Sequence, residues 1–380
     1  MAQQHLDPTD PGAGVATGEA LAAYLRARAT EFLRALRLHR ETGGNGGGPP
    51  AHGGPPARAK SRVGEQSSVG ENGAQESVDA ARLLRRSARR ISGSLHTFRP
   101  LLDPDWSEEM RPELAWLSGT LGLEHAYEAR LERLLLALHR LSGTAVLPVQ
   151  AVDAAPATAP LGSSGPASPA PERGNLTVGA AKAGALLERQ LTLARTRAHS
   201  TALQALGSSR FHAVADKVAV LASEVPLTRT APSTDLRPLA AAAEERLTVA
   251  IGALPLVTAG HPYNAEALVH GLSPDPSPHP QDGPWHQVRL LLRLHRYGQE
   301  VLNGGNTPVD VRLLASGQAL NRHRDASEAA AAAAQAARTP RIAPATAYAL
   351  GVLHADQRHE VEASRFAFQQ AWQKQTVSAP

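Results

Sequence analysis

The sequence contains no cysteine and few aromatic residues. The lack of cysteine excludes disulfide bonds and metal sites built on thiolates, and it is compatible with a reducing cytoplasm. Aromatic residues make up 4% of the 380 positions, whereas the hydrophobic share is 42% and consists mostly of Ala, Leu and Val. Because Ala and Leu are strong helix formers and aromatic residues favour strands, this composition predicts an all-α fold.

Long apolar runs are also absent. No stretch approaches the roughly 20 apolar residues that a helix needs to cross a bilayer, so we expect no membrane segment. Residues 1–18 are polar and lack the basic stretch and apolar core that are typical of a signal peptide. We therefore expect a cytoplasmic protein.

Lysine is scarce among the 39 basic residues: the chain has only four lysines, at positions 60, 182, 217 and 374, and the rest are arginines. Guanidinium groups bind oxyanions in a bidentate way that ammonium groups cannot. A general bias of the composition towards Arg and Ala explains part of this excess. Because the formal net charge is only +4, the local clustering of arginines is more informative than the total charge.

The signatures of common enzymes are missing. The sequence has no GxxxxGK[ST] phosphate loop, no HExxH motif, no GxSxG motif, and no GxGxxG motif after a strand. His354 and His359 are five positions apart, and His286 and His295 are nine apart, so neither pair has the i, i+4 spacing of a helical metal clamp. We expect a protein without catalytic activity, metal or cofactor.

The spacing of apolar residues predicts a series of amphipathic helices separated by polar and Pro-rich segments. We expect a flexible N-terminus (1–17), a first helical half (18–145) with a mobile, disordered insertion (43–75), a linker (146–178), a second helical half (179–373) and a tail (374–380). Ser107 is the predicted N-cap of the third helix. The predicted helices cover residues 19–41, 76–98, 107–139, 179–205, 208–223, 236–251, 285–302, 308–337 and 344–372.

Two of these helices carry basic residues on one narrow face. At about 100° per residue, Arg82, Arg85 and Arg89 lie within roughly 60° of one another. In the second helix, the basic residues at positions 286, 289, 293 and 296 lie within roughly 80°. No acidic residue occurs within 80–100 or between Trp285 and Gln299. The two stripes therefore predict a site for a long polyanion, against the alternative of an exposed face that acidic side chains neutralise.

The two halves also show a weak internal similarity. The first stripe helix leads to His125, 40 positions after Arg85, and the second leads to His323, 34 positions after Arg289. This order fits two duplicated antiparallel bundles. The sequence leaves two roles open for these histidines: a buried polar group, or a donor to an oxyanion whose charge rises below neutral pH. The run Ala329–Ala334 is interpreted as a strong helix former.

The motifs resemble the CHAD domain, the conserved histidine α-helical domain, over most of the chain from about Gly18 to Trp372. Residues 85–102, which end in Phe-Arg-Pro-Leu-Leu, are similar to the family's first basic helix and its exit, with matching arginines at 85, 89 and 90. Residues 285–297 are similar to the second basic helix. Further similar segments are Trp116–Gly119, Leu121-Gly122, His323 with Asp325, and Tyr348–His354.

This resemblance implies two pseudo-symmetric helical bundles with a basic groove between them, and it implies binding of inorganic polyphosphate. Some family members carry an attached triphosphatase domain with an ExExK strand motif, and because this chain has no such segment, hydrolysis is not implied. His323 would be a secondary donor in the groove. The two walls would consist of Arg82, Arg85, Arg89 and Arg90 on one side, and of His286, Arg289, Arg293 and Arg296 on the other.

The chain departs from the family pattern at three places. Arg82 stands at the position of the family's namesake histidine, His125-Ala126 replaces an Arg-Asp pair, and Ser92 replaces a stripe arginine. These departures predict weaker binding by the first half. Two alternatives to polyphosphate stay open, a nucleic-acid backbone and an acidic protein segment. The few aromatic residues available for base stacking make a nucleic acid a weaker candidate than polyphosphate.

Overall fold

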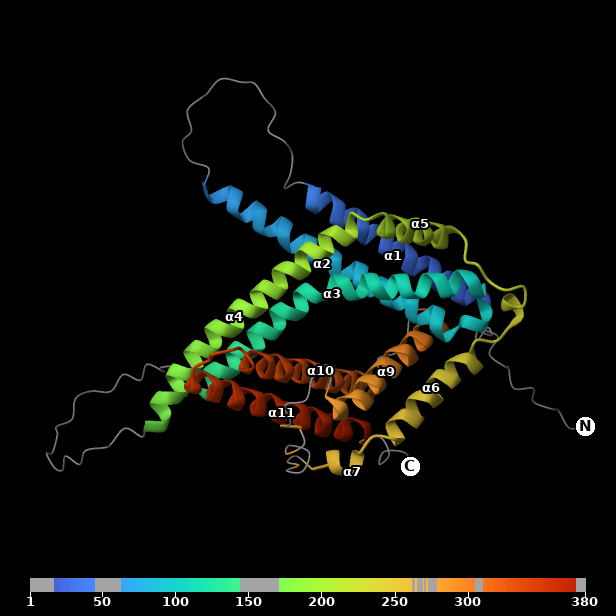
Figure 1. The fold of residues 1–380 in the computed structure, drawn as a ribbon. Coiled ribbons are helices and arrows are strands. Elements are labelled where there is room, and N and C mark those ends of the chain that lie inside the picture. Colours follow the sequence, from blue (N-terminus) through green and yellow to red (C-terminus); the bar gives the residue numbers. More distant parts are fainter. Residues whose placement is uncertain are drawn as a thin grey trace, which may run out of the picture. The chain divides into compact units, whose positions relative to one another are not determined.

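The computed structural model describes residues 17–44, 63–143, 171–261, 264, 269, 271–272, 279–304 and 310–373. Helices dominate these residues (Figure 1), which contain no strand and only an isolated antiparallel bridge between Leu102 and Leu227. The predicted all-α fold class is therefore confirmed. Within the same residues, none of the helices combines the length and apolar character needed to traverse a lipid bilayer.

Contacts divide the chain into two compact units that are interleaved along the sequence. Unit 1 takes its described residues from Met1–Leu123, Ser200–Ile251 and Leu290–Val309, and unit 2 takes the remaining ones. Helices α3 (Pro104–Leu141), α4 (Pro171–Leu206) and α9 (Gly283–Leu302) each contribute residues to both units. The units thus do not coincide with the contiguous halves 18–145 and 179–373, and the predicted pseudo-symmetry of two bundles stays a prediction.

Unit 1 is built around a core of large apolar side chains. Phe32, Ile91, Phe98, Met110 and Phe211 have almost no exposed surface and form one cluster. Helix α1 packs against both α2 and α5 (Figure 1). Besides parts of α3, α4 and α9, unit 1 contains α1 (Gly18–Gly44), α2 (Val63–Thr97), α5 (Ser209–Ser223), α6 (Arg237–Gly252) and the short helices η1 (Arg99–Leu101) and η2 (Ala231–Ser233).

Unit 2 has a core of smaller side chains. Helices α10 (Val311–Ala337) and α11 (Pro344–Gln373) lie side by side (Figure 1). On α10, Ala329, Ala333 and Ala336 are buried against leucines of α11, because methyl side chains allow the two backbones to approach closely. The remaining elements of the unit are α7 (Leu256–Ala259) and η3 (Pro280–Asp282).

Two helices begin earlier than the sequence predicts. Helix α2 begins at Val63, where we expected the mobile insertion to continue to Gln75, and α4 begins at Pro171, inside the expected linker. Once a helix has nucleated, each added turn costs little, so weakly helical residues extend it. Residues 1–16, 45–62, 144–170 and 374–380, which include the rest of the insertion and linker and the predicted N-terminus and tail, lie outside the described residues.

The N-cap of α3 also differs from the prediction. Trp106 N–H donates to Asp103 Oδ1 at 2.9 Å, so Asp103 satisfies an amide at the start of the helix. Ser107, the predicted cap, lies inside the first turn and donates its hydroxyl to the Pro104 carbonyl at 3.2 Å. Helix α5 matches its prediction, because Ser208 accepts a hydrogen bond from Phe211 N–H at 3.2 Å.

Candidate functional site

The first arginine stripe lies on α2 in unit 1, and its members have different surroundings. Arg82 is exposed and forms an ion pair with Asp79, with Nη1 3.2 Å from Oδ1. The expectation that this stripe lacks an acidic partner is therefore wrong for Arg82, because Asp79 directly precedes the acid-free segment and lies one helical turn before Arg82. Arg86, which the predicted set omits, is exposed on the same helix, and its helical spacing could have identified it.

Arg90 pairs with an acid that is distant in sequence. Its Nε donates to Glu300 Oε2 at 2.9 Å, and the Tyr24 hydroxyl donates to the same oxygen at 2.9 Å. Burial lowers the pKa of Arg90, but the hydrogen bond and charge of Glu300 outweigh this effect and raise it overall. Burial and Glu300 raise the pKa of Tyr24. These three residues join α1, α2 and α9, so Arg90 is a structural cation.

Arg85 and Arg89 are four positions apart on α2, so they lie about one helical turn from each other, and both are partly buried. Arg89 Nε donates to the Arg85 carbonyl at 3.3 Å. The Arg85 guanidinium lies against Gly122 of α3, where a Cβ atom would be only 2.4 Å from Arg85 Cζ. The glycine at 122 therefore provides the space that fixes the position of Arg85. In the sequence, Gly122 is recognisable as part of a motif, and its position inside a helix is the signal of a close approach.

Helices α2 and α9 are in direct contact in unit 1. A Cβ atom at Gly93 would lie 2.5 Å from Tyr297 Cδ2 and 3.3 Å from Leu294 Cδ2. This contact, together with the Arg90–Glu300 pair, brings Arg85 and Arg89 into the same unit as Arg293 and Arg296. Arg293 is partly buried, and Arg296 is exposed.

The start of α9 belongs to unit 2 and carries the other two predicted residues. His286 is partly buried, and burial lowers its pKa, with Arg289 and Arg324 acting in the same direction and Asp282 and Glu328 against it. Arg289 Nη1 donates to Asn321 Oδ1 of α10 at 3.3 Å. All four residues of the predicted second stripe belong to α9, with His286 and Arg289 in unit 2 and Arg293 and Arg296 in unit 1.

A buried ionic network that the sequence did not predict lies directly before α9. Asp282 has no exposed surface and accepts hydrogen bonds from Arg358 Nη1 at 2.8 Å, Arg365 Nη2 at 2.7 Å and Ser327 Oγ at 2.6 Å. Burial alone would raise the pKa of Asp282, but Arg358 and Ser327 lower it far below its usual value. Glu362 pairs with Arg365 at 2.7 Å, so the buried acids and arginines balance in charge.

His323 belongs to this network. It is 1% exposed, and its Nε2 accepts a hydrogen bond from Arg365 Nε at 3.3 Å. The ring stacks on Trp285, with centroids 5.6 Å apart, and contacts His286 edge to face at 5.5 Å. Burial and the charge of Arg365 hold its pKa well below the usual value. This placement matches the buried polar role that the sequence left open for His323, and it makes His323 a neighbour of His286.

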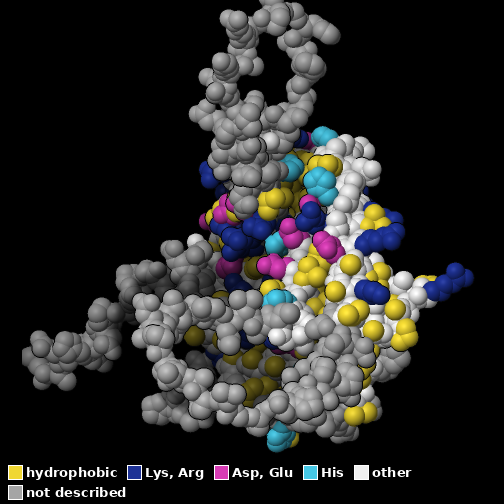
Figure 2. All heavy atoms as spheres, turned by 90° about the vertical axis from the view of Figure 1, so that its left-hand side faces the viewer, with side chains coloured by type: hydrophobic (Ala, Val, Ile, Leu, Met, Phe, Trp, Pro, Cys, Tyr) yellow, Lys and Arg dark blue, Asp and Glu magenta, His cyan; other side chains and the backbone are white. Residues whose placement is uncertain are grey.

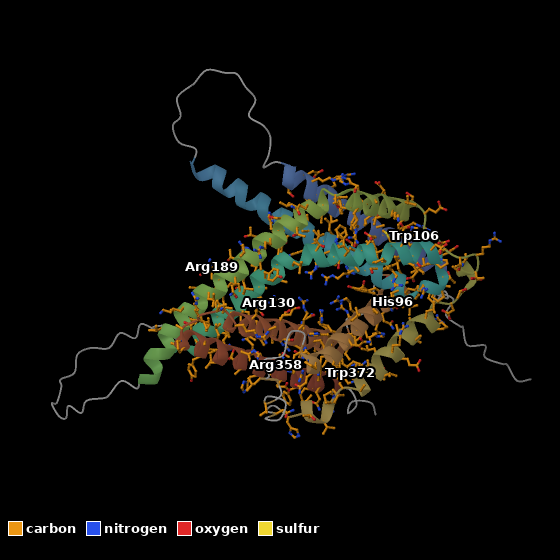
Figure 3. The ribbon with its side chains drawn as sticks, viewed as in Figure 1. His96, Trp106, Arg130, Arg189, Arg358 and Trp372 are labelled. Carbon is orange, nitrogen blue, oxygen red and sulfur yellow. The ribbon has the colours of Figure 1, made fainter. Side chains whose placement is uncertain are left out.

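Several other basic residues of unit 2 are matched by acidic or amide groups. Arg130 pairs with Glu328, which also binds Arg324 at 2.8 Å, and Arg140 Nη2 lies 2.9 Å from Asp356 Oδ1. Figure 2 shows basic side chains next to acidic ones on the face that it presents, and Figure 3 labels Arg130 on α3 and Arg358 on α11. Within the described residues, no group of three or more His, Asp or Glu side chains is arranged to hold a metal ion.

Comparisons with known proteins agree with the helical architecture. The family model described as "CHAD domain" matches residues 70–334, which is more than half of the chain. Among solved structures, PptA from Streptomyces chartreusis is 65% identical, with 94% of this chain and 99% of that chain covered and a TM-score of 0.70. A search of curated proteins found no match.

Proposed function

Because the chain belongs to the CHAD domain family, we propose that it binds inorganic polyphosphate without hydrolysing it, through arginines of α2 and α9. The observation that carries this proposal is the packing of Gly93 against Tyr297, since it joins the two helices with basic stripes in one compact unit. A chain of phosphates fits such a set of guanidinium groups, because each phosphate offers oxygens that a guanidinium group can bind in a bidentate way.

The surroundings of the arginines divide them into two groups. Arg85, Arg86, Arg89, Arg293 and Arg296 are the proposed contact residues; Arg86 and Arg296 are exposed, and the other three are partly buried. Arg90 instead holds α2 to α9 through Glu300, and Arg82 shares its charge with Asp79. The proposed contact surface is therefore narrower than the full set of stripe residues.

His286 and Arg289, at the start of α9 in unit 2, are further proposed contact residues. His286 supplies a proton-dependent contact, since its lowered pKa keeps it neutral in the free protein near pH 7 and a bound phosphate would favour the protonated form. The buried His323 ring contacts the His286 ring edge to face. We expect His323 to position His286, with no direct contact to phosphate.

The proposal is tested by retention of the protein on immobilised long-chain polyphosphate. The double variant Arg89→Glu, Arg293→Glu should lose retention, because it reverses two charges on the contact surface. The matched control is Arg140→Glu, Arg210→Glu, which makes the same change in net charge at arginines whose side chains form surface ion pairs with Asp356 and Glu113. The control should retain binding, and an equal loss in both variants would show that only total charge matters.

Competition separates polyphosphate from the other polyanions. Single-stranded or double-stranded nucleic acid and an acidic peptide should displace the protein only at much higher anion concentration than free polyphosphate. Displacement by a nucleic acid at equal phosphate concentration would favour the nucleic-acid alternative. Displacement by the acidic peptide at equal charge would favour a role as an adaptor.

A further inference from the structure

The basic face of α2 continues beyond Arg89 towards the end of the helix. Ser92 and His96 keep its spacing, so the side chains at positions 85, 89, 92 and 96 lie within roughly 60° of one another. His96 is exposed in the last turn of the helix (Figure 3). The face therefore has an uncharged residue at Ser92 and an ionisable group again one turn later.

Helix α3 runs antiparallel to α2 along this face in unit 1. Ser92 Oγ donates to the Arg111 carbonyl at 3.4 Å, and Gly122, further along α3, lies against the Arg85 guanidinium. Residue numbers thus rise along α3 as they fall along α2. Arg111 therefore lies beside the uncharged position of the face, where it adds a guanidinium group that Ser92 lacks.

Helix α6 reaches the same end of α2. A Cβ atom at Gly298 of α9 would lie 3.8 Å from Thr97 Cγ2 and 3.8 Å from Ala240 Cβ, so α2, α6 and α9 meet at this glycine. Arg246 follows on α6, and its positive charge acts on the His96 ring. Helix α6 thus adds a second guanidinium group to the end of α2.

The acidic charge at this cluster is smaller than the basic charge. Glu108 Oε1 is shared between Arg99 Nε at 2.9 Å and Arg111 Nη1 at 2.8 Å. Arg246 is exposed and forms no ion pair within the described part of the chain. Partial burial of the ring lowers the pKa of His96, and the charges of the three arginines lower it further, against the charge of Glu108. One carboxylate thus faces three guanidinium groups, and the positive field that remains attracts an anion.

We propose that His96, Arg111 and Arg246 form a phosphate subsite that extends the polyphosphate surface to the end of α2. The inference rests on the proposed function, and it assigns residues that neither predicted stripe includes. The face from Arg85 to His96 is roughly 16 Å long at 1.5 Å per residue, so a ligand that contacts both ends must be a chain of phosphates. The two guanidinium groups bind phosphate oxygens, and the protonated His96 ring donates a further hydrogen bond.

Arg246→Gln tests the subsite without breaking an ion pair of the described residues. The matched control is Arg237→Gln, which removes the same charge at an exposed position of α6 that lies about 180° away around the helix. In titrations of the full-length chain with long-chain polyphosphate, Arg246→Gln should bind about threefold to tenfold more weakly than the wild type. Its salt slope should fall by about 0.7, the single-strand value for one phosphate contact. Arg237→Gln should change neither quantity, and equal behaviour of the two variants would overturn the assignment.

The His96 ring allows a second test that does not require a long chain. In an NMR titration of the full-length chain, with the His96→Gln variant identifying the resonance, added pyrophosphate should raise the pKa of His96, because a nearby anion favours the charged ring. Arg246→Gln should raise this pKa in the free protein, since it removes a repelling charge. A pKa that pyrophosphate leaves unchanged would overturn the subsite even if the protein is retained on polyphosphate. A response to pyrophosphate without retention on polyphosphate would support the subsite and contradict the proposed function.

Discussion

At the scale of single residues, arginines that are neighbours on α2 differ because of the groups that surround them. Arg90 is partly buried against Glu300 and Tyr24, whereas Arg89 is one position away and bonds to a backbone carbonyl. Removing one partner of such a partly buried pair would leave the other charge uncompensated. The number of arginines in a stripe is therefore larger than the number available to a ligand.

Gly122 provides a residue-scale test of the contact surface. In Gly122→Ala, the new methyl group would lie 2.4 Å from Arg85 Cζ, so the flexible Arg85 side chain must move. We expect polyphosphate affinity to fall about threefold to tenfold, because the geometry of a charge-assisted contact is lost. The free energy of unfolding should change by less than about 1 kcal/mol, because only the end of an arginine side chain is displaced.

Gly119 of the same helix is the matched control. A Cβ atom at this exposed position has no neighbour within 4 Å, so Gly119→Ala should leave affinity unchanged and raise stability by about 0.5–1 kcal/mol. Fluorescence titration with long-chain polyphosphate and urea unfolding measure the two effects. Equal affinity of the two variants would contradict a contact role for Arg85.

The protonation of His286 predicts a pH dependence of binding. Burial lowers its pKa in the free protein, and a nearby phosphate would raise it, so binding takes up a proton. Affinity should therefore increase as pH falls from about 7.5 to 6, by at most tenfold per pH unit. His286→Gln should remove this increment and leave the arginine-dependent part, as titrations at fixed ionic strength would show. An identical pH profile for the variant would contradict this role.

At the scale of elements, the spacing of apolar residues predicted most helices, but it did not predict every helix start and cap. Helices α1, α5, α9, α10 and α11 lie close to their predicted bounds, because cap and turn residues such as Ser208 and Asp310 mark the ends of helices in the sequence. The start of α2 at Val63 and the cap at Asp103 were missed. Both depend on local competition between neighbouring residues, which periodicity does not resolve.

The site was predictable only in part, for a related reason. Helical spacing located the basic residues, including those of α9, but the acid that binds Arg90 lies 210 positions away in sequence. The sequence pattern did not indicate the buried network around Asp282 either. Its partners Arg358 and Arg365 come from α11 and become its neighbours only in the folded unit. Tertiary contacts thus decide which charged residues are structural.

The contact between α2 and α9 can be tested at its closest point. In Gly93→Ala, the added methyl group would lie 2.5 Å from the Tyr297 ring, so the two helices must separate slightly. We expect a loss of about 1–3 kcal/mol in the free energy of unfolding, as overpacking in a core produces. Polyphosphate affinity should fall as well, because the two arginine-bearing helices shift relative to each other.

Gly351 of α11 is the comparison for this change. It is exposed and has no neighbour within 4 Å of a new Cβ atom, so Gly351→Ala should be neutral or slightly stabilising. Urea unfolding measures both variants. If Gly93→Ala were as stable as Gly351→Ala and bound polyphosphate like the wild type, the close packing of α2 and α9 would have no role in binding.

At the scale of the whole molecule, the two units are stabilised by different interactions. Unit 1 depends on large apolar side chains, whereas unit 2 combines alanine packing with the buried network around Asp282. Because the folded-state pKa of Asp282 is far below its unfolded value near 3.9, its contribution is complete at neutral pH and is lost as pH falls below about 4. Acid should therefore unfold unit 2 through this residue.

Asp282→Asn tests that dependence. The free energy of unfolding of the variant should be about 3–5 kcal/mol lower at pH 7, because Arg358 and Arg365 would lack their shared counter-charge. It should also show less loss of stability between pH 4 and 2 than the wild type. Asp356→Asn, which removes one side of the surface pair with Arg140, should cost less than about 1 kcal/mol. Equal effects of the two changes would show that the network is not the main support of unit 2.

The most direct test of polyphosphate binding by guanidinium groups is the dependence of affinity on salt. If about six phosphates are neutralised, the single-strand slope of roughly 0.7 per phosphate predicts a loss of about 300-fold in affinity between 50 and 200 mM salt. Titration of the wild type with long-chain polyphosphate over this range should give that loss, and Arg89→Glu, Arg293→Glu should give a much smaller one. An affinity that does not change with salt would contradict the account.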